Sequence, residues 1–258
     1  MTTPRTLTHW TRRATALAVA ALMGAACGGG DGAGEPTEPT LPADASVIVE
    51  ASAAAMGDVT SVRFDLRRDG APVYIDQFES IAIDRIVGEF SVPQSAQAAL
   101  DVEVNGSLKT QLAAIALGTE VWLSNPITGE FETLPDGYDI DPSRFFDPQD
   151  GWRPLLAGLT DVELIGLEQR GGDNGGDRYH VRGTATAAQM KVITAGLVGN
   201  QDVAIDFWIQ PVTGLVRSAE FTTAASQNDG DVAADVEGRL ELSQYGEEFT
   251  IVPPDELQ

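Results

Sequence analysis

An alternation of apolar and polar residues, with a period of two, runs through most of the chain after residue 57 and limits its fold more than any other feature. Residues 62–66 read Val-Arg-Phe-Asp-Leu, which is typical of a β-strand with one buried and one solvated face. Asp69-Gly70 then gives a hairpin turn signal. Similar segments follow at short intervals between turns rich in Gly, Asn and Pro, and such a series predicts an antiparallel meander. We expect its further strands at 73–83, 86–92, 100–108, 111–115, 120–124, 130–134, 161–168, 178–184, 203–209, 215–223 and 232–245.

Three segments depart from this alternation and predict helices. Residues 44–55 form an apolar face behind a capping residue, Asp44 or Ser46,. Residues 141–159 carry prolines near helix starts and a glycine near an end, which indicates two short helices,. Residues 186–193 open with the capping-box pattern Thr-Ala-Ala-Gln,. Strands that outnumber helices in this way predict a single α+β domain.

The helices are few compared with the apolar strand faces that they must cover. A long meander therefore has to close into a barrel or curl over its helices. If it curls, the space between sheet and helices could be incompletely filled and suit a ligand with much apolar surface. A dry, packed core remains the alternative at this point.

Charge and composition exclude several classes of function. The 258-residue chain has 39 Asp and Glu against 16 Lys and Arg, a net charge of -23, which would repel nucleic acid and an anionic membrane surface. One cysteine allows no intramolecular disulfide and no Cys cluster, and two histidines leave little room for a zinc site or a catalytic triad,. We therefore expect no catalytic activity, no metal and no cofactor.

Residues 1–26 form a signal peptide rather than part of the fold. A basic stretch containing Arg5, Arg12 and Arg13 precedes an apolar run at 14–23 that is too short to span a bilayer permanently,. Gly-Ala-Ala and then Cys27 follow, the layout of a bacterial lipoprotein signal with Cys27 as the lipid attachment site. Gly24 replaces the usual Leu, so ordinary cleavage that leaves a free thiol stays open as an alternative.

Residues 27–43 predict a flexible acidic tether between this anchor and the domain at 44–258. They are rich in Gly, Pro and acidic residues and contain almost nothing to bury,. Such a segment has an r.m.s. reach of roughly 20–24 Å. The domain would then be lipid-anchored at the extracytoplasmic face of the cell membrane.

Several motifs, in order and spacing, resemble the LppX/LprG family of mycobacterial and actinobacterial lipoproteins. The similarity covers nearly all of the domain, although this chain differs in its acidity, its scarcity of Lys and its lipobox. It rests on EASAAAMGDVTSVRFDL (50–66), VWLSNPITGEFETLP (121–135), FDPQDGWRPLL (146–156), YHVRGTATAAQM (179–190), DFWIQPVTGLVRSAEF (206–221) and LELSQYGEEFTIVPP (240–254).

The resemblance implies a fold and a function. It implies a curved antiparallel half-barrel sheet, similar to the LolA/LolB lipoprotein carriers, with helices on its concave face and a hydrophobic cavity between. It also implies a carrier of acylated lipids or glycolipids across the cell envelope, with a membrane lipid exporter as a candidate partner, and we expect a monomer. The rival hypothesis is a structural or partner-binding envelope lipoprotein with a filled core and no lipid cargo.

Alternation and the helical insert supply candidate lipid-cavity residues, for each of which ordinary core packing is the alternative. Trp152 is the candidate for the cavity mouth. Trp208 falls on the opposite strand face, where partial exposure is expected, and His180 faces outward without a partner in sequence. Acidic segments 136–141 and 173–177 predict solvated turns, with calcium as the alternative. The cavity candidates are Phe64, Leu66, Phe90, Val102, Val104, Phe145, Leu155, Leu156, Leu159, Ile205, Phe207, Ala219 and Phe221.

Overall fold

The computed structural model describes residues 44–76, 78–134, 149–171, 175–194, 201–224 and 235–257. These residues belong to one compact unit that starts at Leu41. The predicted signal peptide and tether, Cys27, Phe145 and the acidic segment 136–141 lie outside the described residues. Segment 173–177 is described only from Gly175 onward.

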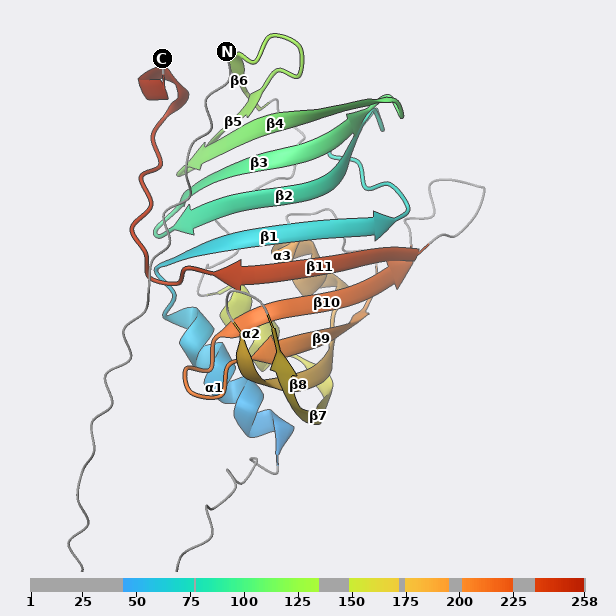
Figure 1. Cartoon of the computed structure of the whole chain (residues 1–258), viewed down its shortest axis with the longest axis vertical. Coiled ribbons are helices and arrows are strands. Elements are labelled where there is room, and N and C mark those ends of the chain that lie inside the picture. Colours follow the sequence, from blue (N-terminus) through green and yellow to red (C-terminus); the bar gives the residue numbers. More distant parts are fainter. Residues whose placement is uncertain are drawn as a thin grey trace, which may run out of the picture. The chain divides into compact units, whose positions relative to one another are not determined.

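Eleven strands form one sheet in which every neighbouring pair is antiparallel (Figure 1). The strand order is β6-β5-β4-β3-β2-β1-β11-β10-β9-β8-β7, so the first and last strands of the chain meet in the middle. The bounds are β1 Ser61–Gly70, β2 Ile81–Ser91, β3 Ser95–Val104, β4 Leu108–Leu117, β5 Glu120–Ser124, β6 Phe131–Thr133, β7 Thr160–Arg170, β8 Gly176–Ala185, β9 Val203–Ile209, β10 Val216–Ala224 and β11 Asp235–Ser243.

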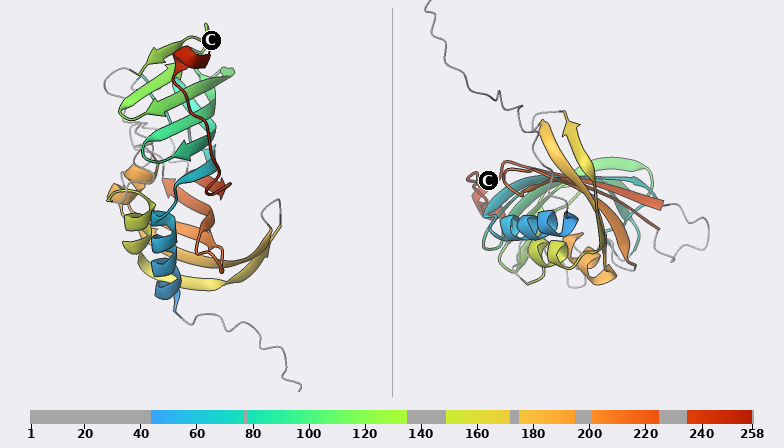
Figure 2. Two further views of the ribbon diagram at one scale, coloured as in Figure 1. Left: turned by 90° about the vertical axis from the view of Figure 1, so that its left-hand side faces the viewer. Right: turned by 90° about the horizontal axis from the view of Figure 1, so that it is seen from below.

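The sheet does not close, because β6 and β7 stand at its two ends without pairing to each other. Figure 2 shows the half containing β7–β10 curling toward the helices, which lie on the concave side. The predicted α+β class, an open curved antiparallel sheet with few helices on one face, is therefore confirmed.

The helices begin where the sequence places their caps. Helix α1 (Ala45–Gly57) starts behind Asp44, whose carboxylate accepts from the Ser46 amide at 2.9 Å,. Before α3 (Ala187–Ile193), the Thr186 amide donates to the Gln189 side chain at 2.8 Å, as a capping box requires,. Of the predicted helical segment 141–159, the described part contains α2, and a 3₁₀ turn closes the described chain. Their bounds are α2 Trp152–Ala157 and η2 Pro254–Leu257.

Two separate apolar clusters cover the concave face. The first lies between the helices and β1 and β7–β11, and includes Met56 of α1, Leu156 of α2 and Phe207 of β9, all at most 1% exposed. The second lies on β2–β5 around Val102 and Leu112. Cross-strand register places both on the same face, because Phe90 pairs with Val62 and Leu100 pairs with Ile86,. One sheet face thus carries two cores that meet near β1 and β2.

Two predicted strands were wrong. The strand expected at 73–83 is largely a connection, with one isolated bridge between Tyr74 and Ala82, because Asp69-Gly70 ends β1 without turning directly into β2. The strand expected at 100–108 spans two strands, since Asn105 and Gly106 form the turn between β3 and β4. Both residues have positive φ angles, 51° and 64°, which suit a tight hairpin,. The alternation continues through this turn, so periodicity alone did not reveal it.

The solvated face of the sheet carries ion pairs between neighbouring strands. Asp65 of β1 accepts from Arg85 of β2 at 2.6 and 2.8 Å and from Arg67 at 3.0 Å. Hydrogen bonding from Arg85 is the main cause that lowers the pKa of Asp65 to about 2, against the opposing effect of burial,. Asp65 therefore links the two strands where the two clusters meet.

We predict that Asp65→Asn lowers the free energy of unfolding at pH 7 by about 1–2 kcal/mol, because the charge-assisted bonds to Arg85 are lost. The pKa of Asp65 is depressed in the folded state, so its contribution is complete above about pH 5 and disappears as the pH falls from about 4 toward 2. Urea denaturation of both proteins at pH 7 and pH 3 measures this. Asp69→Asn, an exposed acid on the same strand, is the control. An equal difference at both pH values would contradict the prediction.

Candidate functional site

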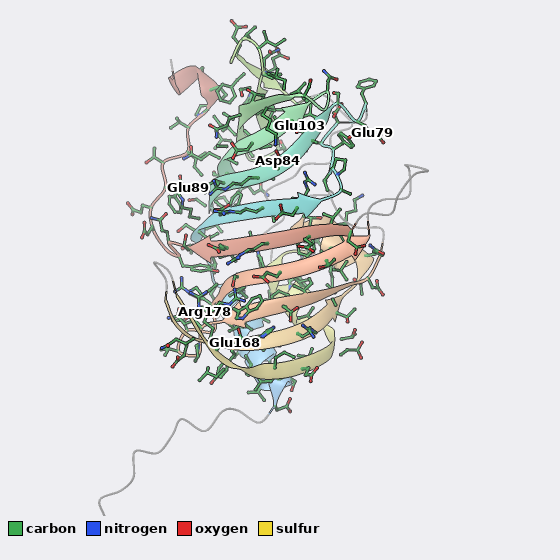
Figure 3. All side chains as sticks on the ribbon, turned by 45° about the vertical axis from the view of Figure 1, so that its right-hand side comes forward. Glu79, Asp84, Glu89, Glu103, Glu168 and Arg178 are labelled. Carbon is green, nitrogen blue, oxygen red and sulfur yellow. The ribbon has the colours of Figure 1, made fainter. Side chains whose placement is uncertain are left out.

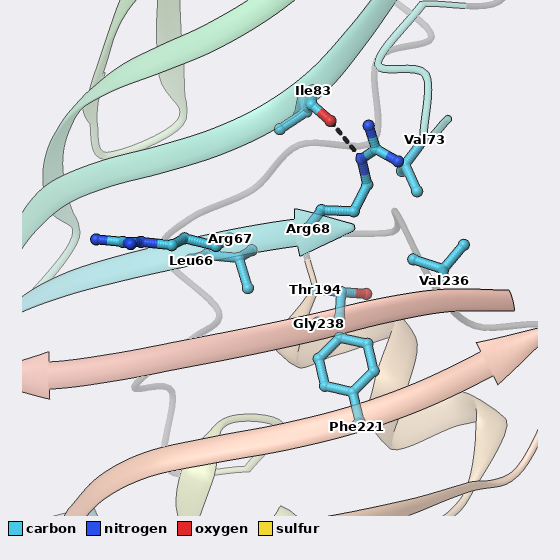
Figure 4. A pocket seen from close by; sticks show the side chains of 9 residues that line it. All are labelled: Leu66, Arg67, Arg68, Val73, Ile83, Thr194, Phe221, Val236 and Gly238. Carbon is cyan, nitrogen blue, oxygen red and sulfur yellow. Dashed lines mark hydrogen bonds between the residues drawn. The ribbon is translucent and has the colours of Figure 1, made fainter. Parts of the chain in front are cut away.

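A small apolar pocket opens on the concave face where β1, β10 and β11 come together (Figure 4). Leu66, Phe221 and Val236 line it from the three strands, and Val73 and Ile83 line it from the β1–β2 connection and β2. Thr194, just after α3, completes the opposite side. The remaining lining residues are Arg67, Arg68 and Gly238.

Glycine 238 gives the aromatic ring of Phe221 its position in this pocket. The two residues are directly paired across β10 and β11, and a Cβ atom at 238 would lie 2.2 Å from Phe221 Cζ. Any larger residue would push the ring out of place. The same arrangement recurs at Gly88, where a Cβ atom would lie 2.5 Å from Phe64 Cζ. Both glycines therefore allow a Phe ring to lie flat across the neighbouring strand.

Arg68 directs its charge away from the pocket and fastens the connection that borders it. Its Nε donates to the Ile83 carbonyl at 2.6 Å, as Figure 4 shows. The rest of the guanidinium binds the carbonyls of Gly70 and Ala71 and the carboxylate of Asp84. The aliphatic stem is what remains to face the apolar side chains. This wall of the pocket is consequently held by hydrogen bonds, not by apolar packing alone.

The pocket lies at the boundary between the two apolar clusters. Ile83 is a member of the second cluster, and Phe221 packs against the first. Its volume is about 30 Å³, whereas sites for drug-sized ligands hold roughly 300–1,000 Å³. As the structure stands, the pocket accommodates a small part of an acyl chain at most. A larger ligand would have to separate the clusters along this boundary.

The predicted cavity residues share the concave face but are divided among three places. Leu66 and Phe221 line the pocket. Val102 and Val104 belong to the second cluster. The first cluster contains, or has packed against it, Phe64, Phe90, Trp152, Leu155, Leu156, Leu159, Ile205, Phe207 and Ala219.

Trp152 does not occupy the mouth of the pocket. It is 2% exposed, belongs to the first cluster and is absent from the pocket lining. The reason is that α2 packs closely on α1, so its first residue is covered. The sequence signal for the actual lining was available in Leu66 and Phe221. The contributions of Val73 and Thr194 were missed, because both belong to connecting segments with no periodicity.

Trp208 lies on the solvated face, as predicted, but the expected exposure was wrong. It is 3% exposed, because the His180 ring stacks on it at 4.5 Å and the Arg170 guanidinium lies 3.5 Å from its ring centre. Its indole N–H donates to Glu168 at 2.8 Å. Charged neighbours on β7 and β8 therefore cover this side chain where no second layer is needed.

His180 has two carboxylate partners, which sequence reasoning did not find. Its Nδ1 lies 2.7 Å from Glu168 and its Nε2 lies 2.7 Å from Asp206. A neutral imidazole has one N–H, so two such bonds fit the doubly protonated ring. Hydrogen bonds from Trp208 and His180 lower the pKa of Glu168. Burial raises the pKa of Asp206, but bonds from Arg182 and His180 outweigh it and the net pKa is lowered. The arrangement links β7, β8 and β9 as a structural network.

Metal and membrane-spanning features are absent from the part of the chain that the structure describes. It contains no group of three or more His, Cys, Asp or Glu side chains that could hold a metal ion. Within the same residues, no helix has the length and apolar character that crossing a membrane requires. The pocket at the cluster boundary is accordingly the candidate site.

Comparison with known proteins decides the family. The family model for the LppX_LprAFG lipoproteins matches residues 44–251, which is most of the chain. The chain belongs to this family. The match runs from the cap of α1 to beyond β11, so the whole described fold of this LppX_LprAFG lipoprotein is included. The resemblance inferred from the sequence motifs is confirmed.

Two solved structures share the fold. LprF from Mycobacterium bovis has 16% sequence identity and a TM-score of 0.59, covering 81% of this chain and 96% of LprF. The lipoprotein LppX from Mycobacterium tuberculosis has 17% identity and a TM-score of 0.52, covering 81% of this chain and 98% of LppX. No curated protein sequence matches this chain. The similarity therefore establishes the architecture of this family member and leaves its ligand to be inferred from its own residues.

Proposed function

We propose that this protein is an extracytoplasmic, membrane-anchored lipoprotein that binds an acylated lipid or glycolipid and carries it across the cell envelope. The observation that carries the proposal is the apolar pocket between two cores on one sheet face, lined by Leu66, Val73 and Phe221. Membership of the LppX_LprAFG lipoproteins supports it.

The energetics favour an acyl ligand at this boundary. Each methylene group removed from water gains about 0.8 kcal/mol, so a long acyl chain gains most from a continuous apolar path. Side chains on both sides of the pocket are apolar, and those of the two cores are already sheltered from water. Separating the cores while an acyl chain fills the gap exchanges one apolar contact for another. An empty gap of the same size would lose that contact energy.

The borders of the pocket differ in how firmly they are fixed. Strands β1, β10 and β11 form a continuous hydrogen-bonded floor. The opposite sides are a short helix end at Thr194 and the connection carrying Val73, which joins β2 through one bridge and a bond from the Ile83 amide to the Val73 carbonyl at 2.9 Å. Carriers must release their cargo, and segments with few hydrogen bonds separate at the lowest cost. We therefore expect the pocket to widen on the Val73 and Thr194 sides.

The small volume of the pocket favours a second candidate, a structural or partner-binding envelope lipoprotein with a filled core. In that case the two clusters would stay in contact permanently, and about 30 Å³ would be a packing defect,. The two candidates differ in one observable, the presence of a noncovalently bound lipid.

Val73→Trp separates these candidates, because a larger side chain at the half-buried position 73 fills the pocket without replacing a strand residue. We predict that the unchanged protein, purified from a lipid-producing host, carries lipid of one or two molecular masses in native mass spectrometry. We expect Val73→Trp to retain several-fold less. Leu164→Trp, on the same face but at the distant edge strand β7, is the control and should retain the normal amount.

Two results would contradict the lipid-carrier proposal. One is a bare polypeptide mass for the unchanged protein, also after incubation with diacyl and triacyl lipids. The other is equal retention in Val73→Trp and Leu164→Trp, which would place the lipid elsewhere.

Anchoring through Cys27 is a separate part of the proposal. A thioether at this cysteine and two or three acyl chains would hold the protein firmly at the membrane, whereas one chain would bind marginally. We predict that a Cys27→Ala protein carries no acyl mass on its N-terminal peptide, while the unchanged protein carries a diacylglyceryl group there. Peptide mass spectrometry of membrane fractions measures this. A free, unmodified Cys27 in the mature protein would support ordinary cleavage instead.

A further inference from the structure

The end of the sheet that holds the pocket also exposes two large apolar side chains. Phe78, in the β1–β2 connection, is 79% exposed, and Leu108, at the start of β4, is 54% exposed. The two segments are joined, because the Asn105 amide in the β3–β4 turn donates to the Ser80 carbonyl at 2.7 Å. We refer to Phe78 and Leu108 as the apolar rim. A single exposed apolar residue is ordinary on a protein surface, so the setting of the rim decides its meaning.

A buried carboxylate shapes the turn that presents Phe78. Asp76 is 7% exposed, and it accepts from the Ser80 amide at 2.9 Å, the Ser80 hydroxyl at 2.7 Å and the Ile81 amide at 2.7 Å. The Glu79 amide also donates to the Asp76 carbonyl at 3.2 Å. With the backbone of this turn satisfied internally, Phe78 is held outward instead of folding back onto the nearby second cluster. The turn thus maintains the exposure of an aromatic ring that water disfavours.

The same connection leads directly into the pocket. Val73 lines the pocket, and Ile75 belongs to the second cluster, three residues before Phe78. The Ile75 amide donates to the Ile81 carbonyl at 3.0 Å, which ties this path to the start of β2. A surface that contacts Phe78 would therefore lie beside the border of the pocket that we expect to widen.

Charged groups beside the rim are mainly acidic. Figure 3 shows Glu79, Asp84 and Glu103 at the same end of the sheet. Lys109 is the nearby cation, and its amine is already 3.2 Å from Asp84 and 3.6 Å from Glu103. Anionic headgroups would be repelled here, whereas a zwitterionic headgroup presents an ammonium group that suits acidic neighbours.

A second copy of this chain fits the rim less well than a lipid surface does. A stable protein interface buries at least about 1,000 Å² with good shape complementarity, and two protruding side chains do not supply that area. A bilayer surface needs no matching shape and gains from each apolar side chain that enters it.

We propose that Phe78 and Leu108 insert into the surface of a bilayer with zwitterionic or uncharged headgroups, and so place the pocket border against the membrane for transfer of the lipid. This docking role rests on the proposed carrier function, because a filled-core protein would have no cargo to transfer.

The experiment uses the full, acylated chain reconstituted in phosphatidylcholine vesicles. A polarity-sensitive fluorophore is attached to Leu108→Cys, and the acylated Cys27 does not compete for the label. We expect spin-labelled lipids to quench this fluorophore. Adding Phe78→Ser should reduce the quenched fraction by roughly tenfold or more, because one large apolar side chain no longer enters the bilayer. Vesicles that contain anionic phosphatidylglycerol should give weaker quenching than phosphatidylcholine alone.

The matched controls use Val212, which is 91% exposed in the β9–β10 turn at the opposite end of the strands. A fluorophore on Val212→Cys should not be quenched, and Val212→Ser should leave quenching at position 108 unchanged. Equal quenching at 108 and 212, or no effect of Phe78→Ser, would overturn the docking proposal. A change of sedimentation coefficient on Phe78→Ser without vesicles would assign the rim to a second copy and would overturn it too.

Failure of docking and failure of the carrier function give different results. Native mass spectrometry of Phe78→Ser should show the normal amount of bound lipid, because Phe78 does not line the pocket. Bound lipid without quenching at 108 would leave the carrier function standing and reject the rim. Quenching without bound lipid in any variant would reject the carrier function and the transfer role together, leaving membrane contact alone.

Discussion

The structure depends on burying one apolar face of a single open sheet. Eleven strands offer more apolar surface than α1, α2 and α3 cover, and the helices gather over the half containing β7–β11 (Figure 2). The other half forms its own cluster on β2–β5. The site exists because the two cores are distinct: where they meet, side chains from both border a pocket that neither fills.

The solvated face explains how so acidic a chain keeps this sheet together. Arginines are placed between carboxylates of neighbouring strands, as Arg85 is beside Asp65 and Arg182 beside Asp206. Near the edge strand β7, Trp208 is covered by His180 and Arg170 on the side that has no second layer. These interactions fix the floor of the pocket and leave its lid to the short helices and to the connection through Val73.

Sequence reasoning reached the fold and stopped short of the site. Period-two alternation predicted β9 at its observed bounds, and the capping box predicted the start of α3, because these signals are local. The 100–108 segment misled, since alternation passes unbroken through the turn at Asn105 and Gly106. Leu66 and Phe221 could be placed on the pocket face from alternation, but Val73 and Thr194 could not. Their position depends on how connecting segments fold back over the sheet, which no local pattern encodes.

The account makes one central claim, that an acyl chain binds where the two cores meet. The most direct test is photo-crosslinking with a diacyl lipid that carries a diazirine at the end of one acyl chain, followed by peptide mass spectrometry. The account predicts adducts on peptides containing Leu66, Val73 and Phe221. Adducts confined to other surfaces, or none above the level of a heat-denatured control, would contradict it.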